Sequence, residues 1–357
     1  MWHILWIPVL LTYILTQCIW EICNNLLSLF AFKSSYHSFD PFAWARGPFV
    51  QTLLVQLNAW RHIHDLKPKH TTIVKTHDNQ IIVLEWIRKT ESAHNIIVLL
   101  HGIGTDCYKA CYFREWYQNS DTISKQTNAD IVIMCRRGHH HDYLLTTTHN
   151  LPTHADVDDI HCVMTHLTEH MRYMKSIYLV GYSGGGHHAL SYATLPNHIS
   201  QLAGVVSVSA SVNLLKLGQH LKASPILDKL LGFTLSELFR QNRHIYKETV
   251  KVKSLKATEM EECNAAQLGI SLDEYWGQMS VHTRLHLIRV PTLIMMSRDD
   301  PVLPVDMHQD ILAANNQNIT MIVTEYGGHV AWITSSMKSW SFHVIKNFIL
   351  AKNSKRK

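Results

Sequence analysis

One serine of the chain stands in a setting that could make it a nucleophile. Ser183 lies in the sequence GYSGG (residues 181–185), between an apolar run at 177–180 and a stretch with helical spacing at 186–194. A strand that turns into a helix through a G-x-S-x-G pattern raises the serine hydroxyl above the sheet. The flanking glycines are needed because larger side chains there would collide with the neighbouring strand and helix. The pattern predicts Ser183 as a nucleophile, and the alternative is a glycine-rich turn with an incidental serine.

A serine hydroxyl is a weak nucleophile near pH 7, so a base must lie within hydrogen-bond distance. In strand–turn–helix enzymes of this kind, the acid and then the histidine follow the serine along the chain. The apolar run at 321–323 is the last predicted strand, and two glycines and His329 come shortly after it. Because the glycines allow this loop to fold back over the sheet edge, we predict His329 as the base.

The carboxylate that orients this histidine is expected in the loop after the preceding strand. The run at 293–296 leads into SRDDPVLP (residues 297–304), which contains two adjacent aspartates. Asp300 has a proline four residues later, the spacing usual for this acid, and is predicted as the third member of a Ser–His–Asp triad. Asp299 remains the alternative, and the aspartate not used would cap a helix or brace the loop.

Acyl transfer also requires backbone N–H groups aimed at the oxygen on which negative charge develops. Gly184, directly after the predicted nucleophile, should supply one of them. The run at 96–100 is followed by HGIG (residues 101–104), and Ile103 is the best candidate for the second. The alternative for this loop is an ordinary turn at the end of a strand. Chemistry of this kind needs no cofactor and no metal.

The elements that must position these residues alternate along the chain. Two β-branched segments at 71–75 and 81–87 predict a hairpin. Short, continuous apolar runs follow, typical of parallel strands buried on both faces. Segments with helical spacing separate the runs, which predicts an α/β fold with a doubly wound, mostly parallel sheet. The runs lie at 96–100, 131–134, 177–180, 205–208, 292–296 and 320–323, and the predicted helices at 157–170, 186–194 and 307–314.

The interval at about 213–287 breaks this alternation. It is rich in Leu, Lys and Glu and has a helical character, so we predict a helical cap inserted between core strands. The catalytic domain is expected over 71–352. The preceding interval, 33–70, is interrupted by prolines such as Pro41 and Pro48 and is predicted to be a linker and N-terminal extension.

Residues 1–32 have the composition of a membrane anchor. The first 20 residues contain no Lys, Arg, Asp or Glu, and an apolar run of this length can cross a bilayer as a helix. A cleaved signal peptide would need a positive start and a small-residue cleavage site, both missing here. A helix lying in the membrane interface is a further alternative. We therefore expect a single-pass protein of the endomembranes or the plasma membrane. Lys33 and Arg46, the nearest cations, slightly favour a cytosolic catalytic domain.

Composition and charge exclude several other classes. Apolar residues make up 46% and charged residues 17% of the 357 residues, as in globular proteins. Lys plus Arg number 33 against 28 Asp plus Glu, and this small excess forms no stripe, so no nucleic-acid partner is expected. Two histidine-rich segments, HLTEH (166–170) and HHHD (139–142), could hold a metal. With 26 histidines in the chain such matches arise by chance, and a metalloenzyme stays a minor alternative.

In order and spacing, the motifs resemble a known family, the membrane-anchored abhydrolase-domain hydrolases with their YheT-like bacterial relatives. The resemblance extends over about residues 40–345. It implies an α/β-hydrolase fold, an N-terminal single-pass anchor, and esterase or lipase activity on acyl lipids such as phospholipids or monoacylglycerols. Gly184 stands where the family usually has a bulky residue, and His187 where it usually has Asn. The matching pieces are Arg46–Leu53, Leu100–Gly104, Arg137–Gly138, Gly181–Gly186, Asp299–Pro301 and Gly327–His329.

The sequence thus predicts a serine hydrolase that cleaves carboxylic esters through an acyl-enzyme on Ser183. Its expected partners are a lipid or small-molecule ester and a membrane. The main alternative is a binding protein that has the same fold but no catalytic activity, because a fold by itself does not establish an activity.

Overall fold

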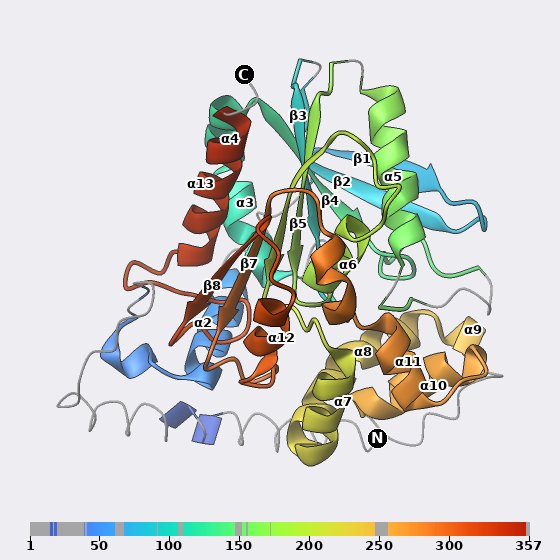
Figure 1. Cartoon of the computed structure of the whole chain (residues 1–357), viewed down its shortest axis with the longest axis vertical. Helices are drawn as coiled ribbons and strands as arrows, with labels where there is room; N and C mark the ends of the chain where they lie inside the picture. Colours follow the sequence, from blue (N-terminus) through green and yellow to red (C-terminus); the bar gives the residue numbers. More distant parts are fainter. Residues whose placement is uncertain are drawn as a thin grey trace.

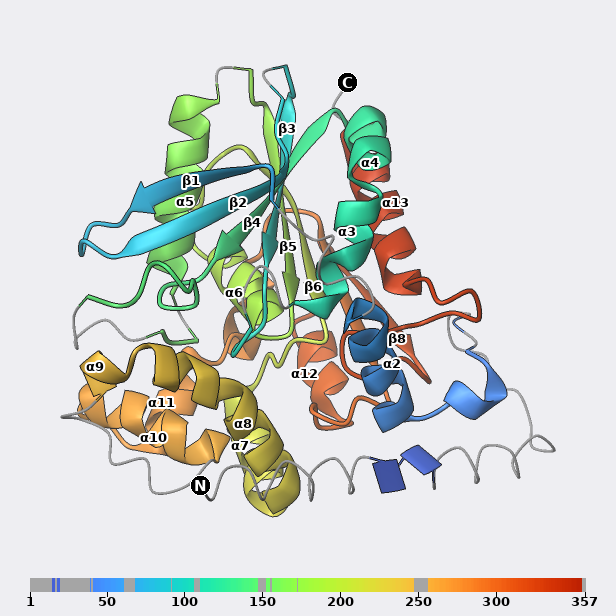
Figure 2. The same ribbon diagram turned by 180° about the vertical axis from the view of Figure 1, so that it is seen from behind.

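The apolar runs of the sequence form the strands of a single sheet (Figures 1 and 2). The computed structural model describes residues 15–16, 18–19, 39, 41–60, 68–90, 92–105, 110–146, 152–154, 156–171, 173–246 and 256–354. The sheet has eight strands in the order β1-β2-β4-β3-β5-β6-β7-β8. They are β1 (His70–Lys75), β2 (Ile81–Arg88), β3 (Asn95–Leu100), β4 (Ala129–Cys135), β5 (Ser176–Tyr182), β6 (Leu202–Val208), β7 (Thr292–Ser297) and β8 (Ile319–Thr324).

The strands at the start of the sheet are antiparallel, and most of the later strands are parallel and fully buried. β1 pairs antiparallel with β2, and β2 pairs antiparallel with β4, whereas all later pairs are parallel. Every residue of β3, β4, β5, β6 and β7 is buried, which explains their unbroken apolar runs. The predicted hairpin and the mostly parallel sheet are both confirmed.

Helices cover both faces of the sheet, as a doubly wound architecture requires. The apolar sides of α5, α6 and α12 pack into one core, and those of α3, α4 and α13 pack into the core on the opposite face. The bounds are α3 (Arg114–Gln118), α4 (Ser120–Thr127), α5 (Val157–His170), α6 (Gly184–Ala193), α12 (Met307–Ala313) and α13 (Trp340–Ser354).

A separate helical layer lies between β6 and β7 in the sequence, and it gathers below the sheet in Figure 1. Its helices have their own apolar clusters, one of them built around Leu214, Tyr275 and Trp276. Local capping defines two of the helix starts: the Asn213 side chain accepts a hydrogen bond from the Lys216 N–H, and Ser271 with Glu274 forms a capping box. The helices are α7 (Leu214–Ala223), α8 (Pro225–Gln241), α9 (Arg243–Tyr246), α10 (Ala257–Gln267) and α11 (Leu272–Met279).

The N-terminal part of the chain is described only in pieces. Helix α2 (Pro48–Trp60) lies within the interval 33–70. Its Gln51 side chain donates a hydrogen bond to the carbonyl of Ile333, in the segment that follows β8. The anchor predicted at 1–32 lies outside the described residues, apart from 15–16 and 18–19. Within the described ranges, no helix has both the length and the apolar composition needed to cross a bilayer.

Candidate active site

Ser183 occupies a sharp turn between β5 and α6. Its φ of 53° and ψ of −123° are unusual for a residue with a side chain, and such strain is common at functional sites. A Cβ atom on Gly181 would lie 2.1 Å from the Gly185 carbonyl oxygen, and one on Gly185 would lie 2.4 Å from the Leu100 carbonyl oxygen. Only glycine fits at either position, so the physical reason predicted for the two glycines is confirmed.

The structure brings Ser183, His329 and Asp300 together from three separate loops. His329 Nε2 lies 2.9 Å from Ser183 Oγ, and His329 Nδ1 lies 2.9 Å from Asp300 Oδ2. Asp300 Oδ1 also accepts hydrogen bonds from the backbone N–H groups of Val302 and Leu303. With Nδ1–H donating to the carboxylate, Nε2 can accept the serine proton, which is the arrangement of a Ser–His–Asp triad.

Asp299 has a different environment from Asp300. Its Oδ1 accepts a hydrogen bond of 2.9 Å from the Gly328 N–H, next to His329 in the sequence. Burial raises the pKa of the Asp299 carboxyl to about 6, and the neighbouring charge of Asp300 adds to the rise. The geometry therefore favours Asp300 as the partner of the histidine and leaves Asp299 to brace the histidine loop.

This raised pKa predicts a pH-dependent effect on stability. In the folded protein the carboxyl has a pKa of about 6, whereas in the unfolded chain its pKa is near 3.8. Between about pH 4 and pH 6 the unfolded chain has therefore lost this proton and the folded protein has kept it. The free energy of unfolding consequently falls as the pH rises through this range. Asp299→Asn stays neutral and keeps the oxygen that faces Gly328. The difference in free energy of unfolding, Asp299→Asn minus parent, should therefore increase by about 2–3 kcal/mol from pH 4 to pH 7. Denaturant unfolding at several pH values measures this, and a pH-independent difference would contradict it.

Ile103 and Gly184 lie side by side at Ser183. A Cβ atom on Gly184 would lie 3.2 Å from the Ile103 nitrogen and 2.9 Å from Ile103 Cγ1, so a larger residue at 184 would compete with Ile103 for space. The Tyr112 hydroxyl accepts a hydrogen bond of 2.6 Å from the Gly102 N–H and fixes the loop. The two residues predicted for the oxyanion site therefore lie together beside the serine.

Helix α2 contributes contacts that the sequence analysis did not foresee. The Thr52 hydroxyl accepts a hydrogen bond of 3.0 Å from the His329 N–H and donates to the Pro48 carbonyl. The fully buried side chain of Gln51 bonds to both the N–H and the carbonyl of Ile333, just past the histidine. In the sequence, the only indication that this segment matters is that Arg46–Leu53 is one of the pieces that match the abhydrolase-domain family. Its structural role is to hold the His329 loop in place.

Removing the Thr52 hydroxyl should therefore weaken the position of His329. In Thr52→Val the shape is kept but the His329 N–H loses its acceptor. We expect kcat to fall by about 10- to 100-fold, because small displacements of a catalytic group are costly. The control is Thr168→Val on α5, whose hydroxyl bonds only within its own helix. Ester hydrolysis at saturating substrate measures the effect, and parent-like kinetics in Thr52→Val would rule out this positioning role.

A cavity opens in front of Ser183, between the sheet edge and helices α7, α8, α10 and α11, and its volume is ≈760 Å³ when the open solvent at its mouth is included. Ser183, Gly184, Ile103 and His329 lie in its wall. The rest of the wall is largely apolar, which suits the hydrocarbon chain of an ester. Its apolar residues include Leu214, Leu217, Leu221, Leu231, Leu235, Ala257, Trp276, Val302 and Leu303.

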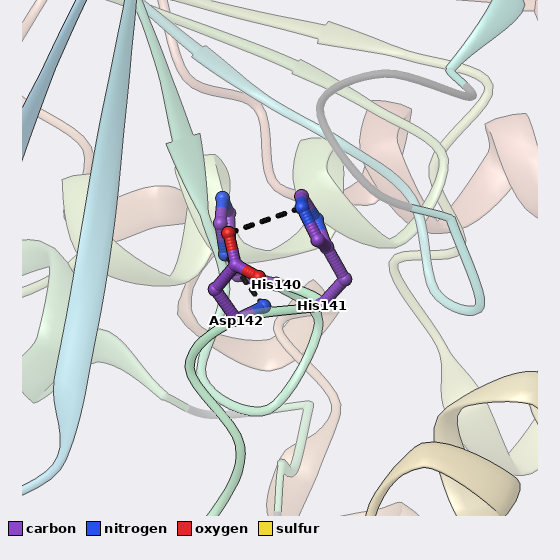
Figure 3. Close-up of side chains that lie close together, drawn as sticks. All are labelled: His140, His141 and Asp142. Carbon is purple, nitrogen blue, oxygen red and sulfur yellow. Dashed lines mark hydrogen bonds and ion pairs between the residues drawn. The ribbon is translucent and has the colours of Figure 1, made fainter.

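The histidine-rich segment after β4 is shown in Figure 3. Potential ligand atoms of His140, His141 and Asp142 lie within 4.8 Å of one another, the one such group in the described ranges. Both nitrogens of His140 are already engaged, Nε2 with Glu85 Oε1 at 3.2 Å and Nδ1 with the Asp142 N–H at 3.2 Å. The other two side chains are exposed. This arrangement is explained by hydrogen bonds to protein groups, without a metal.

The second histidine-rich segment lies at the end of α5. The rings of His166 and His170 stack with their centroids 4.1 Å apart, and His170 Nδ1 bonds to the His166 carbonyl. No third His, Cys, Asp or Glu in the described part of the chain completes this pair as a metal site. The geometry gives the metalloenzyme alternative no support at this position.

A mostly parallel eight-stranded sheet, with a serine at a strand–helix turn and an aspartate and a histidine from later loops, defines the α/β-hydrolase class of proteins. The chain belongs to the alpha/beta hydrolase family, whose profile matches residues 97–338. The resemblance to abhydrolase-domain proteins is thereby confirmed.

Two known proteins show which members of this family the chain is similar to. Phospholipase ABHD3 of Mus musculus is 24% identical over 278 residues, covering 73% of this chain and 66% of that protein. A monoacylglycerol lipase of Saccharomyces cerevisiae is 21% identical over 276 residues, covering 73% of this chain and 60% of that protein. The chain thus spans slightly under two thirds of the length of these two relatives.

The fold is also similar to that of a solved structure. The Pyrococcus furiosus esterase Pf2001 superposes with a TM-score of 0.51 at 16% identity, covering 78% of this chain and 91% of that one. At this identity the likeness concerns the fold alone.

Proposed function

We propose that this protein is a serine hydrolase that cleaves the carboxylic esters of acyl lipids. The observation that carries the proposal is the hydrogen-bonded series Asp300–His329–Ser183, which ends in the wall of a large apolar cavity. The names of the relatives, a phospholipase and a monoacylglycerol lipase, agree with a lipid ester as substrate.

In the first half of the reaction, Ser183 Oγ attacks the ester carbonyl carbon while His329 Nε2 takes the hydroxyl proton. The carbonyl oxygen becomes negatively charged and is stabilised by the N–H groups of Gly184 and Ile103. Asp300 holds the histidine in the tautomer that can accept this proton. His329 then gives the proton to the leaving alkoxide, the ester bond breaks, and an acyl-enzyme and a free alcohol remain.

In the second half, a water molecule takes the place of the alcohol. His329 removes a proton from the water, the resulting hydroxide attacks the acyl carbon, and the bond to Ser183 breaks as its oxygen regains a proton. The fatty acid then leaves. The acyl chain lies throughout against the leucines of α7 and α8 in the apolar cavity.

We also propose that residues 1–32 anchor the protein in a membrane through a single pass. The support is the sequence alone, a run of 20 residues without Lys, Arg, Asp or Glu. An anchor would keep the cavity close to the lipid esters that its apolar wall suits. Partition of the full chain, compared with a variant lacking residues 1–32, into membranes after carbonate washing tests this. Release of both proteins would overturn it.

Pre-steady-state kinetics test the acyl-enzyme. A p-nitrophenyl ester series with acyl chains of 2 to 16 carbons should give a burst of p-nitrophenol equal to the enzyme concentration for chains that deacylate slowly. Rates should rise with chain length as the cavity fills. A folded protein that hydrolyses none of the series would contradict the proposal, and so would a preference for the two-carbon ester.

A further inference from the structure

The loop that carries Ile103 is held by hydrogen bonds on both sides of Gly102. The Gly102 N–H donates to the Tyr112 hydroxyl at 2.6 Å. The Gly102 carbonyl accepts from Thr105 Oγ1 at 3.3 Å and bonds to His101 Nδ1 at 2.8 Å. This carbonyl and the Ile103 N–H are the two ends of one planar peptide group, so the bonds that fix the carbonyl also fix the direction of the N–H.

The protons in these bonds are placed by groups that can only donate. The Arg136 N–H donates to His101 Nε2 at 3.0 Å, so the ring proton of His101 is on Nδ1 and is donated to the Gly102 carbonyl. Thr105 Oγ1 lies 3.4 Å from the Tyr112 hydroxyl. Since Thr105 gives its proton to the Gly102 carbonyl, the Tyr112 hydroxyl donates to Thr105. Burial raises the pKa of Tyr112 above its usual value, so its hydroxyl keeps this proton.

Three of these hydrogen bonds form a closed ring. The Gly102 N–H donates to Tyr112, Tyr112 donates to Thr105, and Thr105 donates back to the Gly102 carbonyl. Hydrogen bonds in such a series polarise one another. The carbonyl receives a second donor from His101, and both donors draw electron density toward the oxygen. The N–H at the other end of the same peptide group, that of Ile103, becomes more positive and a stronger donor.

Tyr112 also packs against the residue that precedes the nucleophile. Its ring stacks on the ring of Tyr182, with the centroids 4.6 Å apart and the planes 16° from parallel. The Tyr182 hydroxyl accepts a hydrogen bond of 2.9 Å from Trp116 Nε1, which fixes this stack in the core. A Cβ atom on Gly102 would lie 3.2 Å from Ser183 Cβ and 3.3 Å from the Tyr112 hydroxyl oxygen. The side chain of Tyr112 therefore sets how the Gly102 loop lies against the serine turn.

We infer that Tyr112 and Thr105 are positioning residues, which aim the Ile103 N–H at the carbonyl oxygen of the ester. This inference rests on the proposed hydrolysis at Ser183 and assigns the side chains that hold one of its oxyanion donors. Neither side chain is part of the cavity wall, so both act through the loop and not on the ester itself. The carbonyl oxygen carries its full negative charge only near the transition state. Loss of the ring should therefore lower kcat and leave KM little changed.

The test begins with Tyr112→Phe, which keeps the stacked ring and removes only the hydroxyl. Its kcat for p-nitrophenyl decanoate should fall by about 10- to 100-fold, somewhat less than when an oxyanion donor is removed outright, and its KM should stay within about threefold. Thr105→Val breaks the same ring of hydrogen bonds without touching the aromatic stack and should lower kcat in the same way. Tyr192→Phe is the matched control and should stay within about twofold of the parent. The Tyr192 hydroxyl also accepts from a backbone N–H, that of Ile199 at 3.2 Å, but it lies at the opposite end of α6 from the nucleophile.

A decyl trifluoromethyl ketone separates this positioning role from a general loosening of the site. Ser183 Oγ attacks the ketone carbon, His329 takes the hydroxyl proton, and the ketone oxygen becomes an oxyanion, so the affinity reports the oxyanion donors. Tyr112→Phe should weaken inhibition by the ketone about 10- to 100-fold and leave inhibition by decanol, which forms no oxyanion, within about threefold.

Equal weakening of the two inhibitors would mean a merely structural role and would overturn the inference. Parent-like kcat in both Tyr112→Phe and Thr105→Val would overturn it as well, and an active parent would then leave the proposed hydrolysis standing. A folded parent that neither hydrolyses the ester nor binds the ketone would overturn the proposed function, and this inference with it.

Discussion

Replacing Ser183 with alanine is expected to lower kcat for ester hydrolysis by about a million-fold, the loss typical when the nucleophile of a triad is removed. The substitution deletes the one oxygen that His329 Nε2 contacts at 2.9 Å, and alanine adds no atom to the tight turn. The fold should be unaffected, because the backbone bonds of the turn, Ser183 N–H to the Val208 carbonyl and Gly186 N–H to the Ser183 carbonyl, remain. Initial rates on a medium-chain p-nitrophenyl ester measure the effect.

A serine on the helix that follows Ser183 provides the control. Ser191 is buried on α6, and its hydroxyl has no hydrogen-bond partner in the described part of the chain. Ser191→Ala should therefore keep activity within about twofold of the parent. If both variants retained parent activity, a nucleophile other than Ser183 would have to be sought.

The second large effect concerns the acid. Asp300→Asn should lower kcat by about ten thousand-fold, because an amide nitrogen facing His329 Nδ1 forces the tautomer in which Nε2 carries a proton and cannot accept one. The protein should still bind ester, since the apolar cavity is unchanged. The comparison is made on kcat, with the parent and the variant measured at the same pH.

Asp299→Asn is the matched control for this change. It is the same substitution one residue earlier, and it keeps the oxygen that accepts from the Gly328 N–H. Its loss should stay within about tenfold, since the brace of the loop is retained. Equal losses in the two variants, or a larger loss in Asp299→Asn, would contradict the assignment of Asp300.

The core of the fold could be predicted because its physical causes are local in sequence. Parallel strands buried on both faces appear as short continuous apolar runs, and each predicted run lies within an observed strand. The turn at Ser183 was predictable for the same reason: Gly181 and Gly185 belong to one segment, and the contacts that require glycine lie within it or against the neighbouring β3.

The features that the sequence analysis did not predict depend on contacts between segments that are far apart in the sequence. Thr52 and His329 are 277 residues apart, and nothing in either segment alone predicts that the threonine hydroxyl holds the histidine loop. The same applies to His154 and Glu261, which are 107 residues apart and meet only because α10 packs over the segment that contains His154. The histidine-rich segment after β4 suggested metal ligands by composition, whereas the structure uses His139 and His140 in hydrogen bonds to protein groups.

The central claim is that Ser183 is a nucleophile activated by His329, and labelling with a fluorophosphonate probe tests it most directly. The folded parent should gain the mass of one phosphonyl group, located by peptide mass spectrometry on Ser183, and Ser183→Ala should gain none. Prior incubation with decanoyl ester should slow the labelling, because both compete for the same hydroxyl. A folded parent that stays unlabelled, or a Ser183→Ala protein that is labelled as fast as the parent, would contradict the account.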